Sequence, residues 1–334
     1  DIDFCVIDIV YRTVPRPNPI YDKRKHGEVA VIDLHGVDRE GHSITVHAHN
    51  FKPYFYVAIP NGFLQSDINT FKNNLNAAAS SDQKNSEVPV IQKVKFVMKR
   101  NIMYYQPEGE RRYLKVITQL PSQVAKCRRL IEEGQVPIPG GSNFVPQTFD
   151  SNVDFVLRFM NDRQITGCSW VSIPANSYTL LESKDKRSFS QIEIDVNYKS
   201  IQYHLCEGEW MEVPKLRIIS FDIEVAGEPD HFPTPDQDPV IQICAYVQIQ
   251  GEKEPLLSVA FVLDTCSKIV GSALYQFEDE SSLLLAWQKF VRFIDPDIVT
   301  GYNIQNFDWP YLTDRAKQIG CKEFCVLGRY IGEH

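Results

Sequence analysis

The order of apolar segments in residues 216–320 restricts the possible folds of this 334-residue chain more than any other feature. Three successive apolar segments, at 216–224, 240–250 and 257–264, predict β-strands. Residues 278–295 predict an α-helix, because apolar residues recur at helical spacing, acids fill the first turn and Pro296 follows. A short buried strand at 298–299 and a helix from about Asp308 to Gly320 are expected next. This alternation predicts an α/β domain.

The residues before this segment predict a separate α+β region. Helix 153–160, which could also be a strand, is favoured because Asn152 can cap it. The length and an ordinary apolar content of 43% permit two domains, which we expect at 1–210 and 211–334. Further strand patterns lie at 29–34, 43–49, 88–98 and 113–118, and further helix patterns at 67–79 and 124–133.

Composition and charge exclude few functions. No apolar run approaches the roughly 18–20 residues that span a membrane, so no membrane partner is expected. The net charge of −8 argues against a strongly basic nucleic-acid-binding surface, although basic grooves can be local. The eight cysteines lack zinc-site spacing, and we expect mostly buried, reduced thiols, as in a cytosolic or nuclear protein. The chain begins at Asp1, so we expect a segment of a longer protein.

Two acids interrupt the first of the three strand patterns. Residues i and i+2 of a strand point to the same side, roughly 6.6 Å apart along the chain, so Asp222 and Glu224 are expected to project from one face. Ile223 would then face the core. Two acids at the end of a strand made for burial are costly, and a divalent cation is a natural compensation. Taken alone, the pair also fits two unrelated acids on a solvated strand edge.

A third acid follows the short strand at 298–299. Gly301-Tyr302-Asn303 turns the chain, and Asp308 lies at the start of the next helix. Taken alone, Asp308 could be no more than a helix cap. Phosphodiester hydrolysis, however, uses such hard oxygen ligands to hold two Mg²⁺ or Mn²⁺ ions roughly 3.5–4 Å apart. The protein then has to supply only carboxylates and a residue that orients the attacking water.

The two acidic segments together resemble the first and second exonuclease motifs of family B DNA polymerases. The resemblance implies a ribonuclease-H-like exonuclease fold in which Asp222, Glu224 and Asp308 bind two divalent metal ions. It also places Asn303 and Phe307 beside the 3′-terminal nucleotide, with the Phe307 ring available for stacking. The segments that carry it are Phe221-Asp222-Ile223-Glu224 and Gly301-Tyr302-Asn303-Ile304-Gln305-Asn306-Phe307-Asp308.

The resemblance extends over nearly the whole chain, including residues 51–56, 152–155, 167–170, 232–233, 238–244 and 295–297. It implies a piece of a nuclear, replicative DNA polymerase that proofreads by hydrolysing the 3′-terminal phosphodiester of DNA. The implied partners are a single-stranded DNA 3′ end, primer–template DNA, accessory subunits and a sliding clamp. The alternative is a non-catalytic DNA- or subunit-binding scaffold with a vestigial exonuclease fold, against which the intact acids argue.

The third exonuclease motif of that family, a Tyr followed four residues later by an Asp, is not found after Asp308. At that spacing Tyr330 has His334. The resemblance therefore implies an exonuclease domain truncated before its third motif, with weakly held or absent metal ions and little hydrolysis. The polymerase domain is missing as well, so the chain is not expected to polymerise DNA.

The first domain resembles the N-terminal domain of the same family, which contacts template. Its aromatic segment, with Phe51, Tyr54, Phe55 and Tyr56, could stack on bases, but we favour a packing role. The basic pieces at 23–26 and 99–100 could contact phosphate, although a solvated loop is the favoured interpretation.

Overall fold

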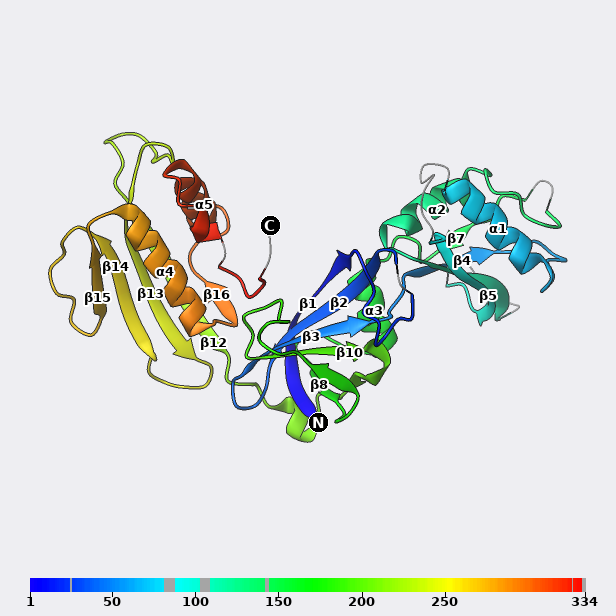
Figure 1. Ribbon diagram of the computed structural model, residues 1–334, viewed down its shortest axis with the longest axis horizontal. Coiled ribbons are helices and arrows are strands. Elements are labelled where there is room, and N and C mark those ends of the chain that lie inside the picture. Colours follow the sequence, from blue (N-terminus) through cyan, green and yellow to red (C-terminus); the bar gives the residue numbers. More distant parts are fainter. Residues whose placement is uncertain (25, 81–87, 103–108, 142–143, 326, 332–334) are drawn as a thin grey trace.

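The computed structural model describes residues 1–24, 26–80, 88–102, 109–141, 144–325 and 327–331. Three β-sheets follow one another in it along an arc (Figure 1). A seven-stranded sheet lies in the middle, a four-stranded sheet on the right and a five-stranded sheet on the left. No helix within the described ranges is long and apolar enough to cross a membrane. The expected mixture of α/β and α+β structure is confirmed.

The five-stranded sheet has the strand order β15-β14-β13-β12-β16. Strands β12, β13 and β14 are antiparallel, whereas β16 pairs with β12 and β15 pairs with β14 in parallel. The predicted element order is confirmed, but β15 was not predicted, and β16 is not buried, since Ile298 is 38% exposed. The elements are β12 (Arg217–Val225), β13 (Val240–Ile249), β14 (Leu257–Leu263), β15 (Ala273–Phe277), α4 (Glu280–Ile294), β16 (Ile298–Thr300), α5 (Asp308–Gln318) and a 3-10 turn (Lys322–Cys325).

Helix α4 fixes one face of β12. Asp279 begins the helix by accepting a hydrogen bond from the backbone N–H of Ser282 at 2.9 Å, and Asp295 ends it with a left-handed φ of 52°. On its buried side the Trp287 ring lies 5.3 Å from the Phe221 ring of β12, measured between centroids. Burial of each such large apolar side chain contributes about 1.5–3 kcal/mol. The Phe221 side of β12 is therefore committed to the core.

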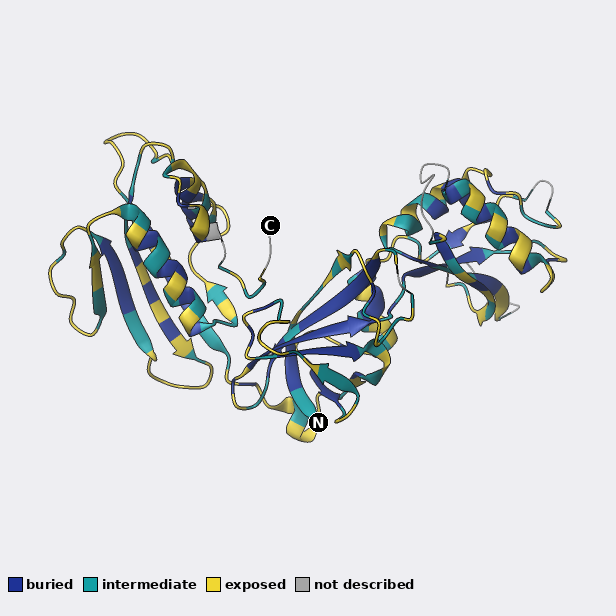
Figure 2. Ribbon diagram, in the orientation of Figure 1, coloured by how far each residue is buried: buried dark blue, intermediate teal, exposed yellow. Residues whose placement is uncertain are grey.

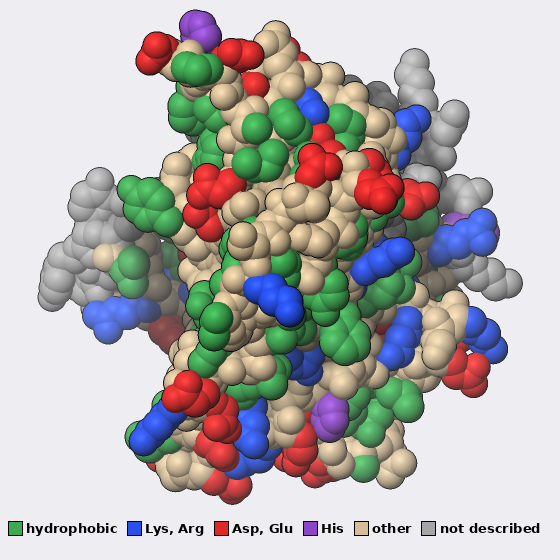
Figure 3. All heavy atoms as spheres, turned by 90° about the vertical axis from the view of Figure 1, so that its left-hand side faces the viewer, with side chains coloured by type: hydrophobic (Ala, Val, Ile, Leu, Met, Phe, Trp, Pro, Cys, Tyr) green, Lys and Arg blue, Asp and Glu red, His purple; other side chains and the backbone are tan. Residues whose placement is uncertain are grey.

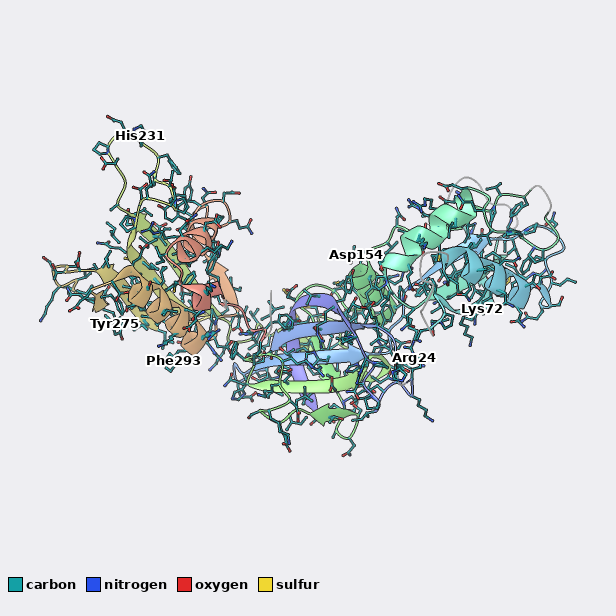
Figure 4. The ribbon with its side chains drawn as sticks, turned by 45° about the horizontal axis from the view of Figure 1, so that its top comes forward. Arg24, Lys72, Asp154, His231, Tyr275 and Phe293 are labelled. Carbon is teal, nitrogen blue, oxygen red and sulfur yellow. The ribbon has the colours of Figure 1, made fainter. Side chains whose placement is uncertain are left out.

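The seven-stranded sheet has the order β11-β8-β1-β2-β3-β10-β9. Helix α3 (Phe155–Arg163) covers its apolar face through Phe155 and Phe159. The helix prediction is confirmed, but its cap is Asp154 and not Asn152, because the Asp154 carboxylate accepts the backbone N–H of Val156 at 2.8 Å (Figure 4). The strands are β1 (Ile2–Val14), β2 (Val29–Val37), β3 (Ser43–His49), β8 (Trp170–Ile173), β9 (Tyr178–Leu180), β10 (Ile192–Asn197) and β11 (Gln202–Tyr203).

The opposite face of this sheet is polar and yet buried. His47 donates from its two ring nitrogens to Asp33 at 2.6 Å and to Glu193 at 2.8 Å, and all three residues have 0% exposure. Arg12 also binds the Asp33 carboxylate at 2.6 Å, and the Tyr330 hydroxyl donates to it at 2.9 Å. Every polar group of this cluster is paired, as burial in a protein interior requires. We call Asp33, His47 and Glu193 the buried charge cluster.

The four-stranded sheet packs α1 and α2 against one of its faces, over a core of its own (Figure 1). Helix α1 has the bounds predicted from the sequence. The elements are β4 (Tyr54–Ala58), α1 (Asp67–Ala79), β5 (Ile91–Lys99), β6 (Arg111–Thr118), α2 (Ser122–Glu132) and β7 (Thr148–Phe149), in the sheet order β5-β6-β4-β7. Phe51, Tyr54, Phe55 and Tyr56 are all buried, which is the packing role favoured above.

The cysteines differ from the expectation. Of the seven whose side chains are described, Cys5, Cys127 and Cys321 are buried, and all seven are free thiols. Cys168, Cys206 and Cys244 are exposed and Cys266 is partly exposed, so the expectation of mostly buried thiols is wrong. In a strand such as β13, alternate positions of an apolar segment face solvent, and Cys244 occupies one of them.

The central and five-stranded sheets are joined through Asp295. Its carboxylate accepts hydrogen bonds from Ser43 at 2.5 Å and from Arg329 at 2.6 Å, and its backbone oxygen accepts one from Arg217 at 3.2 Å. A 3-10 helix, Gly208–Met211, precedes β12 on the connecting segment. We propose that the boundary between domains 1–210 and 211–334 lies on this segment.

Candidate metal centre

The first two candidate acids lie on the exposed side of β12. Phe221 and Ile223 are buried, whereas Asp222 and Glu224 are exposed. The two carboxylates therefore point away from the core that holds α4 and α5, as the alternation in the sequence predicts. Among the described residues no helix covers this side of the sheet, and Figure 2 shows alternating exposed and buried bands along its strands.

Asp308 reaches the same strand from the first residue of α5. Its Oδ1 atom accepts a hydrogen bond from the backbone N–H of Ile223 at 3.2 Å. Asp308 is buried, with only 1% of the residue exposed. The N–H of Ile223 is available because β16 pairs with β12 only as far as Ser220. Beyond that point α5 takes the place of the parallel strand and presents its acid to the strand edge between Asp222 and Glu224.

Within the described ranges, the three acids lie without a basic partner. Burial raises the pKa of Asp308, and the Asp222 carboxylate raises it further, against the backbone N–H groups of Asp308 and Ile223, which lower it. No lysine or arginine in the described part of the chain pairs with Asp222, Glu224 or Asp308. Two adjacent carboxylates need a proton or a cation for balance. Three hard oxygen donors without a counter-charge fit a divalent cation.

The three carboxylates are spread along the strand edge and do not form one tight cluster. Within the described ranges, the one set of three possible ligand atoms lying within 4.8 Å of one another is Asp38, Glu40 and His42, in the turn between β2 and β3. Acidic side chains also predominate in the upper half of the molecule when it is viewed from the five-stranded sheet (Figure 3).

Gly301 allows the loop after β16 to pass directly against β12. A Cβ atom on Gly301 would lie 2.4 Å from the backbone oxygen of Phe221 and 2.4 Å from Cγ2 of Ile304. We expect Gly301→Ala to displace the loop that leads to Asp308 and to lower the free energy of unfolding by about 1–3 kcal/mol, measured in urea. Gly167→Ala is the control, because its added Cβ meets nothing within 4 Å. Equal losses in the two variants would show that the close approach is unimportant.

Asn303 and Phe307 lie on the loop that leads into α5. Asn303 is exposed, with a left-handed φ of 54°, and its backbone oxygen accepts the N–H of Phe307 at 3.1 Å. Phe307 is half-buried, with its ring centroid 5.6 Å from that of Phe232 and 5.5 Å from that of Tyr311. The Asn303 side-chain oxygen accepts a hydrogen bond from Nδ2 of Asn306 at 2.9 Å, so its NH₂ group and part of the Phe307 ring remain open to a ligand near Asp308.

Tyr311 supports the site and was not singled out from the sequence, whereas Phe232 was noted only as part of the family resemblance. The Tyr311 hydroxyl donates to the backbone oxygens of Thr234 and Asp238, both at 2.9 Å, and holds the loop of residues 226–239 beside α5. His231 lies at the far tip of this loop in Figure 4. Phe232, on the same loop, is 78% exposed. Its contact with Phe307 was not predicted, although a large apolar side chain in a polar, proline-containing loop is a signal for a contact residue.

A buried ion pair fixes α5 relative to α4. Arg315 donates to the Glu280 carboxylate at 3.0 and 2.8 Å, and both side chains are about nine-tenths buried. The same carboxylate accepts the backbone N–H of Val240 at 2.8 Å, at the start of β13. Glu280 was predicted only as a favourable first-turn acid, and its distant partners could not be identified from local sequence.

Tyr330 does not lie at the carboxylates. Its hydroxyl donates to Asp33 at 2.9 Å and bonds to a ring nitrogen of His35 at 3.0 Å, on the polar face of the central sheet. His334, which has the spacing of the third-motif acid, lies outside the described residues. The candidate centre therefore contains Asp222, Glu224 and Asp308, with Asn303 and Phe307 nearby.

A mixed sheet with two acids on the exposed face of one strand and a further acid from the following strand–helix unit is consistent with the class of ribonuclease-H-like exonuclease domains. Comparison with known families agrees. Residues 146–334 match the family model "DNA polymerase family B, exonuclease domain", and residues 50–125 match "DNA polymerase delta catalytic subunit-like, N-terminal domain". The chain belongs to DNA polymerase family B through its exonuclease domain, a domain that generally depends on divalent metal ions.

The individual relatives that the chain resembles are catalytic subunits of DNA polymerase delta. The DNA polymerase delta catalytic subunit of Oryza sativa subsp. japonica is 41% identical over 91% of this chain and 27% of its own length. That of Bos taurus is 39% identical over 98% of this chain and 30% of its own length. The chain thus spans less than a third of these relatives.

A solved structure supports the fold. The family B DNA polymerase of the archaeon Pyrobaculum calidifontis superposes with a TM-score of 0.64 at 24% identity, covering 96% of this chain and 33% of that one.

Proposed function

We propose that this chain contributes the N-terminal region and part of a proofreading exonuclease to a replicative DNA polymerase. Its reaction is 3′→5′ hydrolysis of the terminal phosphodiester of single-stranded DNA. The observation that carries the proposal is the bond between Asp308 and the backbone N–H of Ile223. It brings the acid of one motif to the strand that carries Asp222 and Glu224.

Each residue has a defined task in this proposal. Asp222, Glu224 and Asp308 would hold two Mg²⁺ or Mn²⁺ ions, which when bound would supply positive charge for activating a water and stabilising the leaving 3′ oxygen. Ile223 keeps Asp308 in place through its backbone N–H. The Asn303 amide binds the sugar or phosphate of the last nucleotide, and the Phe307 ring stacks on its base. Phe232 packs against the Phe307 ring and would cover its solvent-facing edge.

The proposal includes what the sequence resemblance implies for the whole protein. A Tyr and an Asp of a third motif would complete the water-binding part of the site, and a site without them would bind metal ions weakly and hydrolyse DNA slowly. The partners are primer–template DNA, accessory subunits and a sliding clamp, and the location is the nucleus. The similarity to polymerase delta catalytic subunits supports these assignments.

Mn²⁺ binding tests the metal assignment on the chain itself. We expect weak binding, which can be measured as a decrease in the electron paramagnetic resonance signal of free Mn²⁺. The affinity should be at least about tenfold lower in Asp222→Ala. Glu252→Ala, which removes an exposed acid from the turn between β13 and β14, should bind as the wild type does. A chain carried on through the third motif is expected to bind Mn²⁺ more tightly. Equal binding by the wild type and Asp222→Ala in both chains would refute the assignment.

A further inference from the structure

Lys115 lies in the middle of the outer face of the four-stranded sheet, which the exonuclease proposal does not use. In β6 it stands directly opposite Lys95 of β5 on one side and opposite Tyr56 of β4 on the other. Its neighbours Leu114 and Val116 belong to the core under α1 and α2, so the Lys115 side chain points away from that core. Lys115 is half-buried among the side chains of this outer face.

The Lys115 ammonium rests on two tyrosine rings, each of which it shares with another cation. It lies 3.2 Å from the ring centroid of Tyr54 and 6.0 Å from that of Tyr56. The guanidinium carbon of Arg158, on α3, lies 4.6 Å from the Tyr54 centroid, and the Lys99 ammonium lies 5.7 Å from the Tyr56 centroid. Both tyrosines are buried. The rings attract the cations, but their aromatic surface also takes the place of water around the Lys115 ammonium.

Lys115 forms no ion pair in the described part of the chain, and neither do Lys95 and Lys99. Asp162 of α3 is near enough to favour the ammonium form of Lys115, but the Tyr54 hydroxyl already donates to its carboxylate at 2.6 Å. Lys95 and Lys115 face each other across an antiparallel pair, where like charges destabilise a sheet. Loss of the charge on Lys115 would therefore relieve a repulsion within the fold.

These surroundings favour the neutral amine of Lys115 over the ammonium. Burial lowers its pKa most, and the charges of Lys95, Arg158 and Lys99 lower it further, to about 8 from an ordinary 10.5, against the effect of Asp162. A neutral amine has a free lone pair and is a nucleophile, whereas an ammonium is not. At neutral pH, Lys115 therefore provides this nucleophile more often than an ordinary lysine does.

A cavity of about 300 Å³ opens over the same two rings, Tyr54 and Tyr56, which are part of its lining. Its charged lining consists of three cations and two acids: Lys99, Arg100, Arg158, Asp150 and Asp162. Both acids already have partners, since Asp150 pairs with Arg158 at 3.0 Å and Asp162 accepts the Tyr54 hydroxyl. The volume is at the lower end of small-ligand pockets, roughly 300–1,000 Å³. A small anion is the kind of molecule that this cavity suits.

We propose that Lys115 is a site of covalent N-acylation by a small anionic acyl donor of the acyl phosphate class. The Lys115 nitrogen attacks the acyl carbon, so that an amide N–C bond forms and the bond between the acyl carbon and the phosphate oxygen breaks. The phosphate leaves with the electron pair of that bond and takes up the proton that the nitrogen loses. The cations Lys99 and Arg158 beside the amine attract the phosphate of the donor and stabilise it as it leaves.

The test incubates the whole chain with acetyl phosphate and measures the initial rate of acetylation at each lysine by mass spectrometry. At about pH 7.5, Lys115 should react at least about fivefold faster than Lys253 and Lys268, two exposed lysines on loops of the five-stranded sheet. The rate at Lys115 should rise with pH and level off above about pH 8. The rate of an ordinary lysine, in contrast, rises up to about pH 10.4.

Lys95→Gln tests the part played by the neighbouring charge. It removes the charge directly opposite Lys115, so acetylation of Lys115 should slow by at least about twofold and its rate should level off at a higher pH. Lys95→Arg keeps the charge and should keep the wild-type rate and pH profile. The matched control is Lys253→Gln, which should leave Lys115 unchanged. The melting temperature of Lys95→Gln should stay the same or rise, because a like-charge pair is removed, so slower acetylation cannot be ascribed to unfolding.

Inorganic phosphate, added at constant ionic strength, tests whether the anion of the donor is bound. It should slow acetylation of Lys115 and leave Lys253 and Lys268 unaffected.

Four outcomes would overturn the proposal. They are a rate at Lys115 no higher than at Lys253 and Lys268, a rate at Lys115 that climbs with pH as theirs does, equal rates at Lys115 in the wild type and Lys95→Gln, or no selective effect of inorganic phosphate. None of these measurements involves DNA or a metal ion, so their results are independent of the exonuclease proposal.

Discussion

Replacement of His47 by alanine is expected to lower the free energy of unfolding by about 3–5 kcal/mol, because it leaves buried carboxylates without their shared partner. The imidazole bonds to Asp33 on one side and to Glu193 on the other, and none of the three residues is exposed. Arg12 and Tyr330 still contact Asp33 in the variant, and Ser188 still contacts Glu193. These interactions limit the destabilisation but do not replace the cation between the two acids.

The destabilisation should depend on pH, with the sign set by the two kinds of group. Burial raises the pKa of Glu193, but hydrogen bonds from His47 and Ser188 lower it more, to about 2 from an ordinary 4.5. This contribution is present above pH 4.5 and is lost as the pH falls toward about 2. The contribution of Asp33 to stability depends on pH in the same direction. Burial raises its pKa, but His47 and Arg12 lower it more.

The contribution of His47 to stability depends on pH in the opposite direction. Burial lowers its pKa, but the hydrogen bonds to Asp33 and Glu193 raise it to a value above the ordinary 6.5. Its contribution is fully present below pH 6.5 and is lost as the pH rises through the raised value. The difference in stability between wild type and His47→Ala should therefore be largest between pH 4.5 and 6.5, where all three groups contribute.

Urea denaturation across this pH range measures the effect, and His42→Ala is the matched control. His42 also pairs with an aspartate, Asp38, but its side chain is 48% exposed. An exposed pair contributes only about 0–1 kcal/mol. If His47→Ala costs no more than His42→Ala, or if its cost does not change with pH, the buried charge cluster does not stabilise the fold in the way described.

The buried charge cluster also shows where sequence reasoning stops. Residues 43–49 alternate polar and apolar side chains, and the strand was predicted from that alternation. Alternation alone indicates a solvated polar face, yet His47 has 0% exposure. Its partner Glu193 is 146 residues away in the sequence. Only the parallel pairing of β3 with β10 brings the two side chains to one face.

Local signals were sufficient elsewhere. Helix α1 has the predicted bounds because its apolar residues repeat at helical spacing and lie on one core. Strand β15 was missed because it pairs only at the edge of its sheet and has no fully buried residue. The orientation of Asp222 and Glu224 follows from the period of a strand. The position of Asp308 does not, since it depends on where β16 stops pairing with β12.

The candidate metal centre makes the other large prediction, for Asp308→Asn. Asparagine keeps an oxygen that can accept the backbone N–H of Ile223, so the loop and α5 should stay in place. It removes a negative charge that lies beside Asp222 in a buried position. The free energy of unfolding should therefore not fall, which separates this variant from one that damages the fold.

Hydrolysis, in contrast, should fall by several powers of ten, on the order of 4 kcal/mol or more in activation free energy, because a hard ligand of a two-ion site is removed. The measurement is the release of 3′-terminal nucleotides from single-stranded DNA with Mg²⁺, by a chain carried on through the third motif. Asp314→Asn is the control, since Asp314 lies on the same helix and is an exposed acid whose only described ion pair is with Lys317. Activity retained in Asp308→Asn, or lost equally in Asp314→Asn, would remove Asp308 from the metal centre. Loss of activity in Asp308→Asn alone, at unchanged stability, would leave charge at this strand edge as the property on which the reaction depends.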